Sequence, residues 1–120
     1  MDPELVYVSA LAFLDQFISR GAADDLHQLR AKLANDEHTK KLLLDQLPAH
    51  DVDEREAFDA LRQFLAIELE QRERREWAGG PDLVLLLSWT EWNWDDGRTT
   101  SDPAQWHDWV GAIDTARRAV

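Results

Sequence analysis

The helical character of this chain is clearest in residues 51–65, which read Asp51-Val-Asp-Glu-Arg-Glu-Ala-Phe-Asp-Ala-Leu-Arg-Gln-Phe-Leu65. Two capping boxes are possible at its start, one pairing Asp51 with Glu54 and the other pairing Asp53 with Glu56. In such a box the two side chains satisfy backbone N–H groups that the first helical turn leaves free. Apolar side chains then recur with the 3.6-residue period of a buried face, at Phe58, Leu61, Phe64 and Leu65. The stretch therefore predicts a helix with one face in a core.

Helical patterns continue on both sides of this stretch. Toward the N-terminus, helices are predicted over residues 3–19, 23–34 and 37–47. Pro48 should end the third, because a proline pushes the residue before it out of helical geometry. On the other side, residues 68–76 are almost wholly polar, and we expect them to extend the helix into solvent.

The C-terminal third carries two further segments. Residues 82–92 contain the run Leu83-Val-Leu-Leu-Leu87, which fits a helix or a buried strand. We expect a helix, because no second segment could pair with a strand. The last helix should begin after Asp102 as N-cap, with Pro103 in its first position and Gln105 closing a capping box. Its expected buried stripe consists of Trp106, Trp109, Val110 and Ile113.

Together these segments predict an all-α fold, a compact single-domain bundle of about five to six helices over residues 1–120. The clearest loop lies at 77–81, where the sequence is Trp77-Ala-Gly-Gly-Pro81. It precedes a tryptophan-rich, acidic part at 82–115. About forty residues make a poor core of their own, so we do not expect this loop to separate two domains.

The charge balance points to the kind of partner. Twenty-four acids against thirteen bases give a net charge of −11. Such a surface repels nucleic acid and anionic membranes, whereas it attracts a basic protein. The chain has no cysteine, no apolar run long enough to cross a bilayer, and acid rather than base in Met1-Asp-Pro-Glu4. We therefore expect a cytoplasmic protein that binds a basic protein, with no role for nucleic acid or membrane.

Catalytic and metal-binding patterns are missing from the sequence. No two of the four histidines lie three or four residues apart, as a helical metal site would require. The serines lie in no hydrolase motif, and no glycine-rich phosphate loop or calcium loop occurs. We expect no catalytic residues, no metal site and no cofactor, and hence a binding protein rather than an enzyme.

The tryptophans suggest where a partner binds. Five of the six fall between residues 89 and 109, and residues 82–115 hold seven acids against one base, a local charge of −6. Trp89, Trp106 and Trp109 share helical faces with aliphatic residues and are expected in the core. Trp92 and Trp94 are two residues apart, so they cannot both join one helical face. The partner-binding residues predicted from this pattern are Glu91, Trp92, Trp94, Asp95 and Asp96.

Three segments carry a resemblance to a known group of proteins. They are Glu56-Ala-Phe-Asp-Ala-Leu-Arg-Gln-Phe-Leu65, Asp82-Leu-Val-Leu-Leu-Leu87 and Asp96-Gly-Arg-Thr-Thr-Ser-Asp-Pro-Ala-Gln-Trp-His-Asp-Trp109. Over residues 54–114 the chain resembles small acidic immunity proteins encoded beside bacterial polymorphic toxins, including those of contact-dependent growth inhibition. The resemblance implies a cytoplasmic inhibitor that binds a toxin domain, often a nuclease, and blocks its active site or substrate groove.

Two other functions remain open at this point. One is a DNA mimic of the anti-restriction type, which presents carboxylates in place of phosphates. It would need rows of acids at phosphate-like spacing, and the mixing of tryptophan with aspartate at 89–96 does not suggest them. The other is a non-enzymatic adaptor or regulator. The sequence does not indicate which activity the toxin has, or the oligomeric state.

Overall fold

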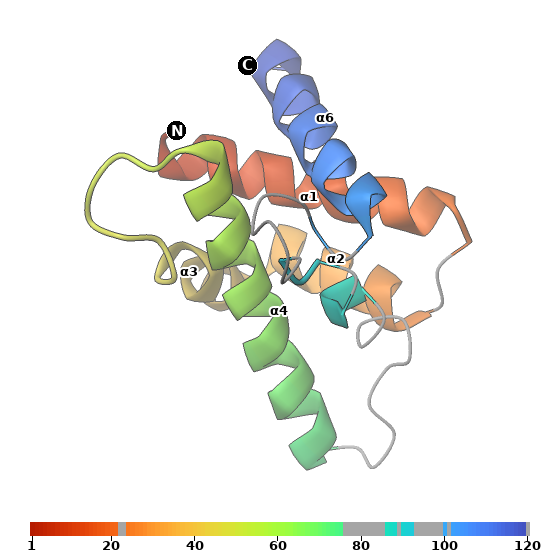
Figure 1. Cartoon of the computed structure of the whole chain (residues 1–120). Coiled ribbons are helices and arrows are strands. Elements are labelled where there is room, and N and C mark those ends of the chain that lie inside the picture. The colour runs from red at the N-terminus through yellow and green to blue at the C-terminus, as the bar shows by residue number, and fades with distance from the viewer. Residues whose placement is uncertain (22–23, 76–85, 89, 93–99, 101, 120) are drawn as a thin grey trace.

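The helices account for most of the chain and confirm the all-α prediction. A computed structural model describes residues 1–21, 24–75, 86–88, 90–92, 100 and 102–119, with the backbone alone at 24 and 72–75. The labelled helices are α1 (Pro3–Ser19), α2 (Asp24–Asn35), α3 (Glu37–Leu44), α4 (Glu54–Arg75) and α6 (Pro103–Ala119) (Figure 1). Residues 86–88 are also helical. Within these ranges the extended backbone pairs once, in an antiparallel bridge between Trp92 and Thr100.

Aspartate side chains cap α1, α3, α4 and α6, and for α4 and α6 the sequence predicts an aspartate cap. At α4 the capping box is the one formed by Asp53 and Glu56, since the Asp53 carboxylate accepts from the Glu56 N–H at 2.8 Å. The Glu56 carboxylate accepts from the Asp53 N–H at 3.2 Å in return. The alternative box with Asp51 does not form, because that carboxylate accepts from the N-terminal amine at 3.0 Å. At α3 the Asp36 carboxylate accepts from the backbone of His38.

Two predicted helix ends are wrong. The helix expected over 37–47 ends at Leu44, and residues 45–47 continue in the tighter turns that precede Pro48. The helix expected to reach about Trp92 ends before it, because Trp92 lies in the bridge. The Thr90 hydroxyl donates to the Leu87 carbonyl at 2.8 Å. The Glu91 N–H donates to the Ser88 carbonyl at 3.3 Å. The hydroxyl thus bonds a carbonyl at the point where the helical segment ends. The predicted loop at 77–81 lies outside the described residues.

The start of α6 departs from the sequence prediction in two ways. The Asp102 carboxylate caps the N–H of Ala104 at 3.1 Å, but Gln105 does not close a capping box. Its side chain is buried, and its carbonyl oxygen has no hydrogen-bond partner. Val110 is 37% exposed instead of buried, because the face toward the core passes through Trp109, Ala112, Ile113 and Ala116.

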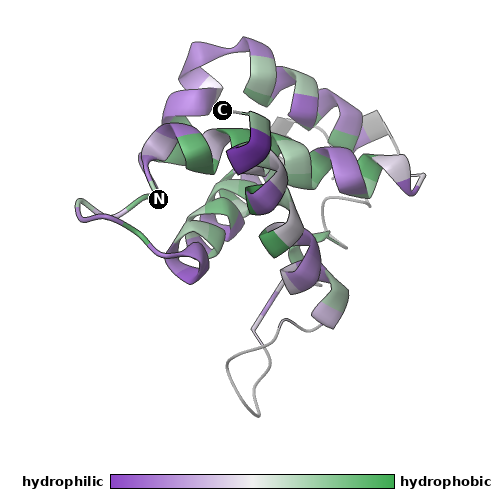
Figure 2. Cartoon of the chain, turned by 90° about the horizontal axis from the view of Figure 1, so that it is seen from above, coloured by the Kyte–Doolittle hydropathy of each residue, from purple (hydrophilic) through white to green (hydrophobic). Residues whose placement is uncertain are grey.

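The first and last helices pack against each other in opposite directions, and α6 crosses α1 in Figure 1. Arg20, just after α1, pairs with Asp108 near the start of α6. At the other end, Arg117 lies beside the first turn of α1. Gly111 lies beside the Gln16 side chain, and a Cβ added there would make only an ordinary contact with it, at 3.8 Å. Apolar residues gather on the inner faces of the helices and polar ones outside (Figure 2).

One buried acid contradicts the expectation that residues 68–76 face solvent. The stretch does continue α4 as a helix to Arg75. Glu68, however, is only 2% exposed, and Lys32 of α2 holds its carboxylate at 3.1 Å. Its position follows from helical geometry, because Leu61, Leu65 and Glu68 recur on one face. The salt bridge therefore joins α2 to α4 at the edge of the core.

Candidate partner-binding surface

An aromatic cluster links the core to the surface near the predicted site. Phe58 of α4 lies at its centre, with ring centroids 5.9 Å from Phe13 and 5.6 Å from Trp109. On its other side lie Trp92 and Trp106, each 5.7 Å away. Trp109 is fully buried, as expected from the sequence, whereas Trp92 and Trp106 are half-buried. The aromatic contacts thus continue from α1 outward to residue 92.

Trp92 is an anchor that holds its own segment onto α4. Its indole N–H donates to the Asp59 carboxylate at 2.6 Å. The guanidinium of Arg55 lies 4.2 Å from the centre of its ring, a cation–π contact. The indole N–H and one ring face of Trp92 are therefore already in contact with α4. Trp92 has less surface left for binding another protein than an exposed tryptophan would have.

Thr100 fixes the other end of the interval that begins after Trp92. It is buried and pairs with Trp92 in the antiparallel bridge. Its hydroxyl donates to the Asp102 carbonyl and accepts from the backbone N–H of Trp106 at 3.3 Å. These contacts tie the bridge to the start of α6. The predicted site residues Trp94, Asp95 and Asp96 belong to this interval and lie outside the described residues, as does Trp89.

A shallow groove of about 390 Å³ separates α4 from the segment that leads to Trp92. We call it the α4 groove. Its lining residues come from both walls: Asp59, Arg62, Gln63, Ala66, Leu87 and Glu91. Of the predicted site residues, Glu91 lines this groove and is exposed. Trp92 does not line it, but its indole N–H donates to Asp59, which does.

A second groove of about 320 Å³ follows the opposite flank of α4. Asp59 and Gln63 line both grooves and so form a ridge between them. The outer wall of the second groove is the turn after α3, at residues 46–48, and Glu56 lies on the α4 side. The Glu56 carboxylate is 2.6 Å from the imidazole of His50.

On the other described faces Glu37, Asp45 and Asp53 form no ion pair, but six pairs join an acid to a lysine or an arginine. These pairs are Arg20 with Asp108, Arg30 with Asp15, Lys32 with Glu68, Lys40 with Glu4, Arg117 with Glu54, and Arg118 with Asp114. In the α4 groove, by contrast, Arg62 donates to the Thr90 hydroxyl at 3.4 Å. Within the described part of the chain, Asp59 and Glu91 have no basic partner. Part of the chain's excess negative charge therefore lies in this groove.

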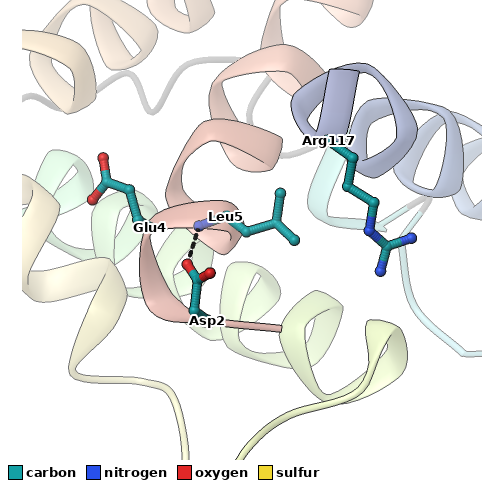
Figure 3. Close-up of a pocket in the computed structure, with 4 residues that line it drawn as sticks. All are labelled: Asp2, Glu4, Leu5 and Arg117. Atoms are coloured by element: carbon teal, nitrogen blue, oxygen red, sulfur yellow. Dashed lines mark hydrogen bonds between the residues drawn. The ribbon is translucent and has the colours of Figure 1, made fainter. Parts of the chain in front are cut away.

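A third cavity, of about 280 Å³, lies where the start of α1 meets the end of α6 (Figure 3). Its polar residues already have structural roles. Asp2 caps the Leu5 N–H at 2.8 Å, Glu4 pairs with Lys40 at 3.1 Å, and Arg117 lies 3.6 Å from Glu54. Figure 3 shows the Glu4 carboxylate pointing away from Arg117. This cavity therefore offers no converging set of unpaired groups.

The chemistry available at the α4 groove is that of recognition by charge and hydrogen bonding. In the described ranges, no three histidine, aspartate or glutamate side chains come together to hold a metal ion. None of the helices in those ranges is long and apolar enough to cross a membrane. Sequence reasoning missed the α4 wall, namely Asp59, Arg62, Gln63 and Ala66. Helical periodicity could have placed these residues off the core face, but it could not have placed them beside Glu91.

The class that the fold and the surface define is an all-α helical bundle with a partly acidic groove along α4. No protein-family model, curated protein or solved structure matches this chain.

Proposed function

We propose that this protein is an immunity protein, which binds a basic bacterial toxin domain in the cytoplasm and blocks it by occlusion. The observation that carries the proposal is the net charge of −11, together with a groove whose carboxylates lack basic partners in the described part of the chain. A nuclease presents a basic surface to its substrate, and an acidic protein complements that surface. The resemblance of residues 54–114 to immunity proteins supports the same function.

The described face of α4 supports a protein partner over DNA mimicry. Along this face the acid Asp59 is followed by the uncharged Gln63 and Ala66. A mimic of the phosphate backbone would need closely and regularly spaced charges instead, because duplex DNA carries about one charge per 1.7 Å of its axis. Neutralisation by this chain requires no catalysis, only a complex stable enough to exclude the toxin's substrate.

The proposal is tested with the toxin domain encoded immediately beside this gene. That domain is expressed from an inducible promoter, with and without this chain, and cell survival is counted. The purified toxin domain is then assayed on its substrate with increasing inhibitor. We expect rescue of growth and stoichiometric inhibition. An unrelated acidic protein of similar size and charge serves as the control for unspecific attraction. Equal killing with and without this chain contradicts the proposal.

A further inference from the structure

The lining of the α4 groove combines apolar and acidic side chains. Leu87 and Ala66 supply aliphatic surface, one from each wall. Asp59 and Glu91 supply carboxylates, again one from each wall. A long basic side chain matches this arrangement, because its methylene stem packs on apolar surface while its charged end bonds to acids.

The hydrogen-bonding capacity of the two acids is incompletely used. One oxygen of the Asp59 carboxylate accepts from the Trp92 indole, which also fixes the direction of the carboxylate. Its second oxygen has no hydrogen bond within the described residues, and neither has the exposed carboxylate of Glu91. Arg62 also lines the groove, where it donates to the Thr90 hydroxyl and forms no ion pair with either acid.

From this geometry we propose that the α4 groove is the specificity pocket for an arginine side chain of the partner. The inference deepens the proposed function, on which it rests for the basic partner. A guanidinium is planar and carries five N–H donors, so it can bond to carboxylates on two walls at once. Lysine concentrates its charge at one point and cannot reproduce this fork. Gln63, on the ridge, supplies a further carbonyl acceptor at the groove's edge.

The arginine preference can be measured without knowing the toxin. Uniformly ¹⁵N-labelled protein is titrated with a hexa-arginine peptide at about 0.15 M salt, where charges further apart than about 8 Å are screened. We expect the amide shifts to concentrate at Gln63, Ala66, Leu87 and Glu91. We expect a hexalysine peptide to bind several-fold more weakly. Shifts spread evenly over the acidic surface, or equal binding of both peptides, overturn the proposal.

Two charge-matched variants locate the contact. Glu91→Lys reverses a charge in the groove, whereas Asp114→Lys makes the same change on the exposed side of α6. We expect the first to weaken hexa-arginine binding about tenfold and the second less than about twofold. Equal weakening by the two variants would show that net charge alone governs binding. Circular dichroism of each variant checks that it remains folded.

A second pair of variants connects the groove to neutralisation. Ala66→Arg fills the groove with charge and bulk, and Ala31→Arg adds the same residue on the exposed face of α2. With the toxin domain as probe, we expect Ala66→Arg to lose at least about tenfold in affinity and Ala31→Arg to keep wild-type affinity. If the wild type and Ala66→Arg neutralise the toxin equally well, the proposed arginine pocket is refuted, whereas the proposed immunity function is supported. If the wild type neutralises no toxin, the proposed function fails, and the peptide titration decides on the groove alone.

Discussion

A single carboxylate, Asp59, determines how Trp92 is used. The sequence predicts Trp92 as a contact residue because tryptophan is enriched in binding hot spots. In the structure its indole N–H is bonded to Asp59 and its ring is covered by Arg55. No spacing rule could have found this pair, because 33 positions separate the two residues along the chain. Glu91, one residue earlier, keeps an exposed carboxylate and remains a candidate for partner contact.

Replacing Asp59 should therefore loosen the segment that Trp92 anchors. Asp59→Ala removes the acceptor of a partly buried indole N–H, and we expect a loss of about 1–3 kcal/mol in the free energy of unfolding. Asp59→Asn keeps an oxygen acceptor and should lose less. Urea denaturation measures both losses, and the indole N–H resonance of Trp92, assigned with Trp92→Phe, reports the bond directly. An unmoved resonance in Asp59→Ala would show that the bond does not form in solution.

At the level of the helices, the starts were more predictable than the ends and faces. A helix start is signalled locally, and the Asp53–Glu56 capping box of α4 appears as the spacing predicts. The segment before Trp92 ends early, where the chain enters the bridge with Thr100, and periodicity does not report such a pairing. The exposure of Val110 depends on where α1 lies, and this tertiary information is absent from the pattern of α6.

Two glycines should respond to alanine in opposite directions. Gly21 follows α1 with φ of 97°, a left-handed conformation, and nothing lies within 4 Å of an added Cβ. Gly21→Ala should therefore destabilise the fold by about 1 kcal/mol, through backbone strain alone. Gly111 is inside α6, where an added Cβ makes only an ordinary contact. Gly111→Ala should stabilise by about 0.5–1 kcal/mol. Thermal and urea denaturation measure both, and shifts of the same sign would contradict this account of the two sites.

The acid that caps α3 should make stability depend on pH. The hydrogen bond from the Thr39 hydroxyl, followed by the one from the His38 N–H, lowers the pKa of Asp36 from its ordinary value of 3.8. A lowered pKa means that the charged cap stabilises the fold above pH 3.8, and that this contribution is lost as the pH falls through the folded-state value. Asp36→Asn keeps a capping oxygen but cannot titrate. The difference in urea midpoint between the wild type and this variant should shrink as the pH is lowered below 3.8. A difference that stays constant would argue against the charged cap.

For the whole molecule, the all-α class was predictable but the neighbours of each helix were not. Periodicity shows that a helix has a buried face without showing what covers it. The pairing of α1 with α6 and the placing of Glu91 beside α4 both depend on such neighbours. Net charge, in contrast, needs no tertiary information, and it leads to a prediction about rates.

Association with the proposed basic partner should be electrostatically steered. With a net charge of −11, we expect the association rate constant to fall steeply as salt is raised, while the dissociation rate constant changes much less. Stopped-flow or surface-based kinetics with the toxin domain, at several salt concentrations and constant pH, measure both rates. Association rates that do not change with salt would contradict a basic partner.

The pairing of the first helix with the last has a consequence for protein synthesis. Ribosomes add about 5–20 residues per second, so α1 waits roughly 5–20 s before α6 has been made. During that time Phe13 of α1 lacks Trp109 of α6, whose ring lies 6.0 Å from its own in the finished protein. A truncated mRNA or a stalled ribosome yields a chain that stops before Pro103. Such a chain cannot complete the bundle. Such fragments expose apolar surface and become substrates for proteases, so only fully translated copies add to the cell's supply of the folded protein.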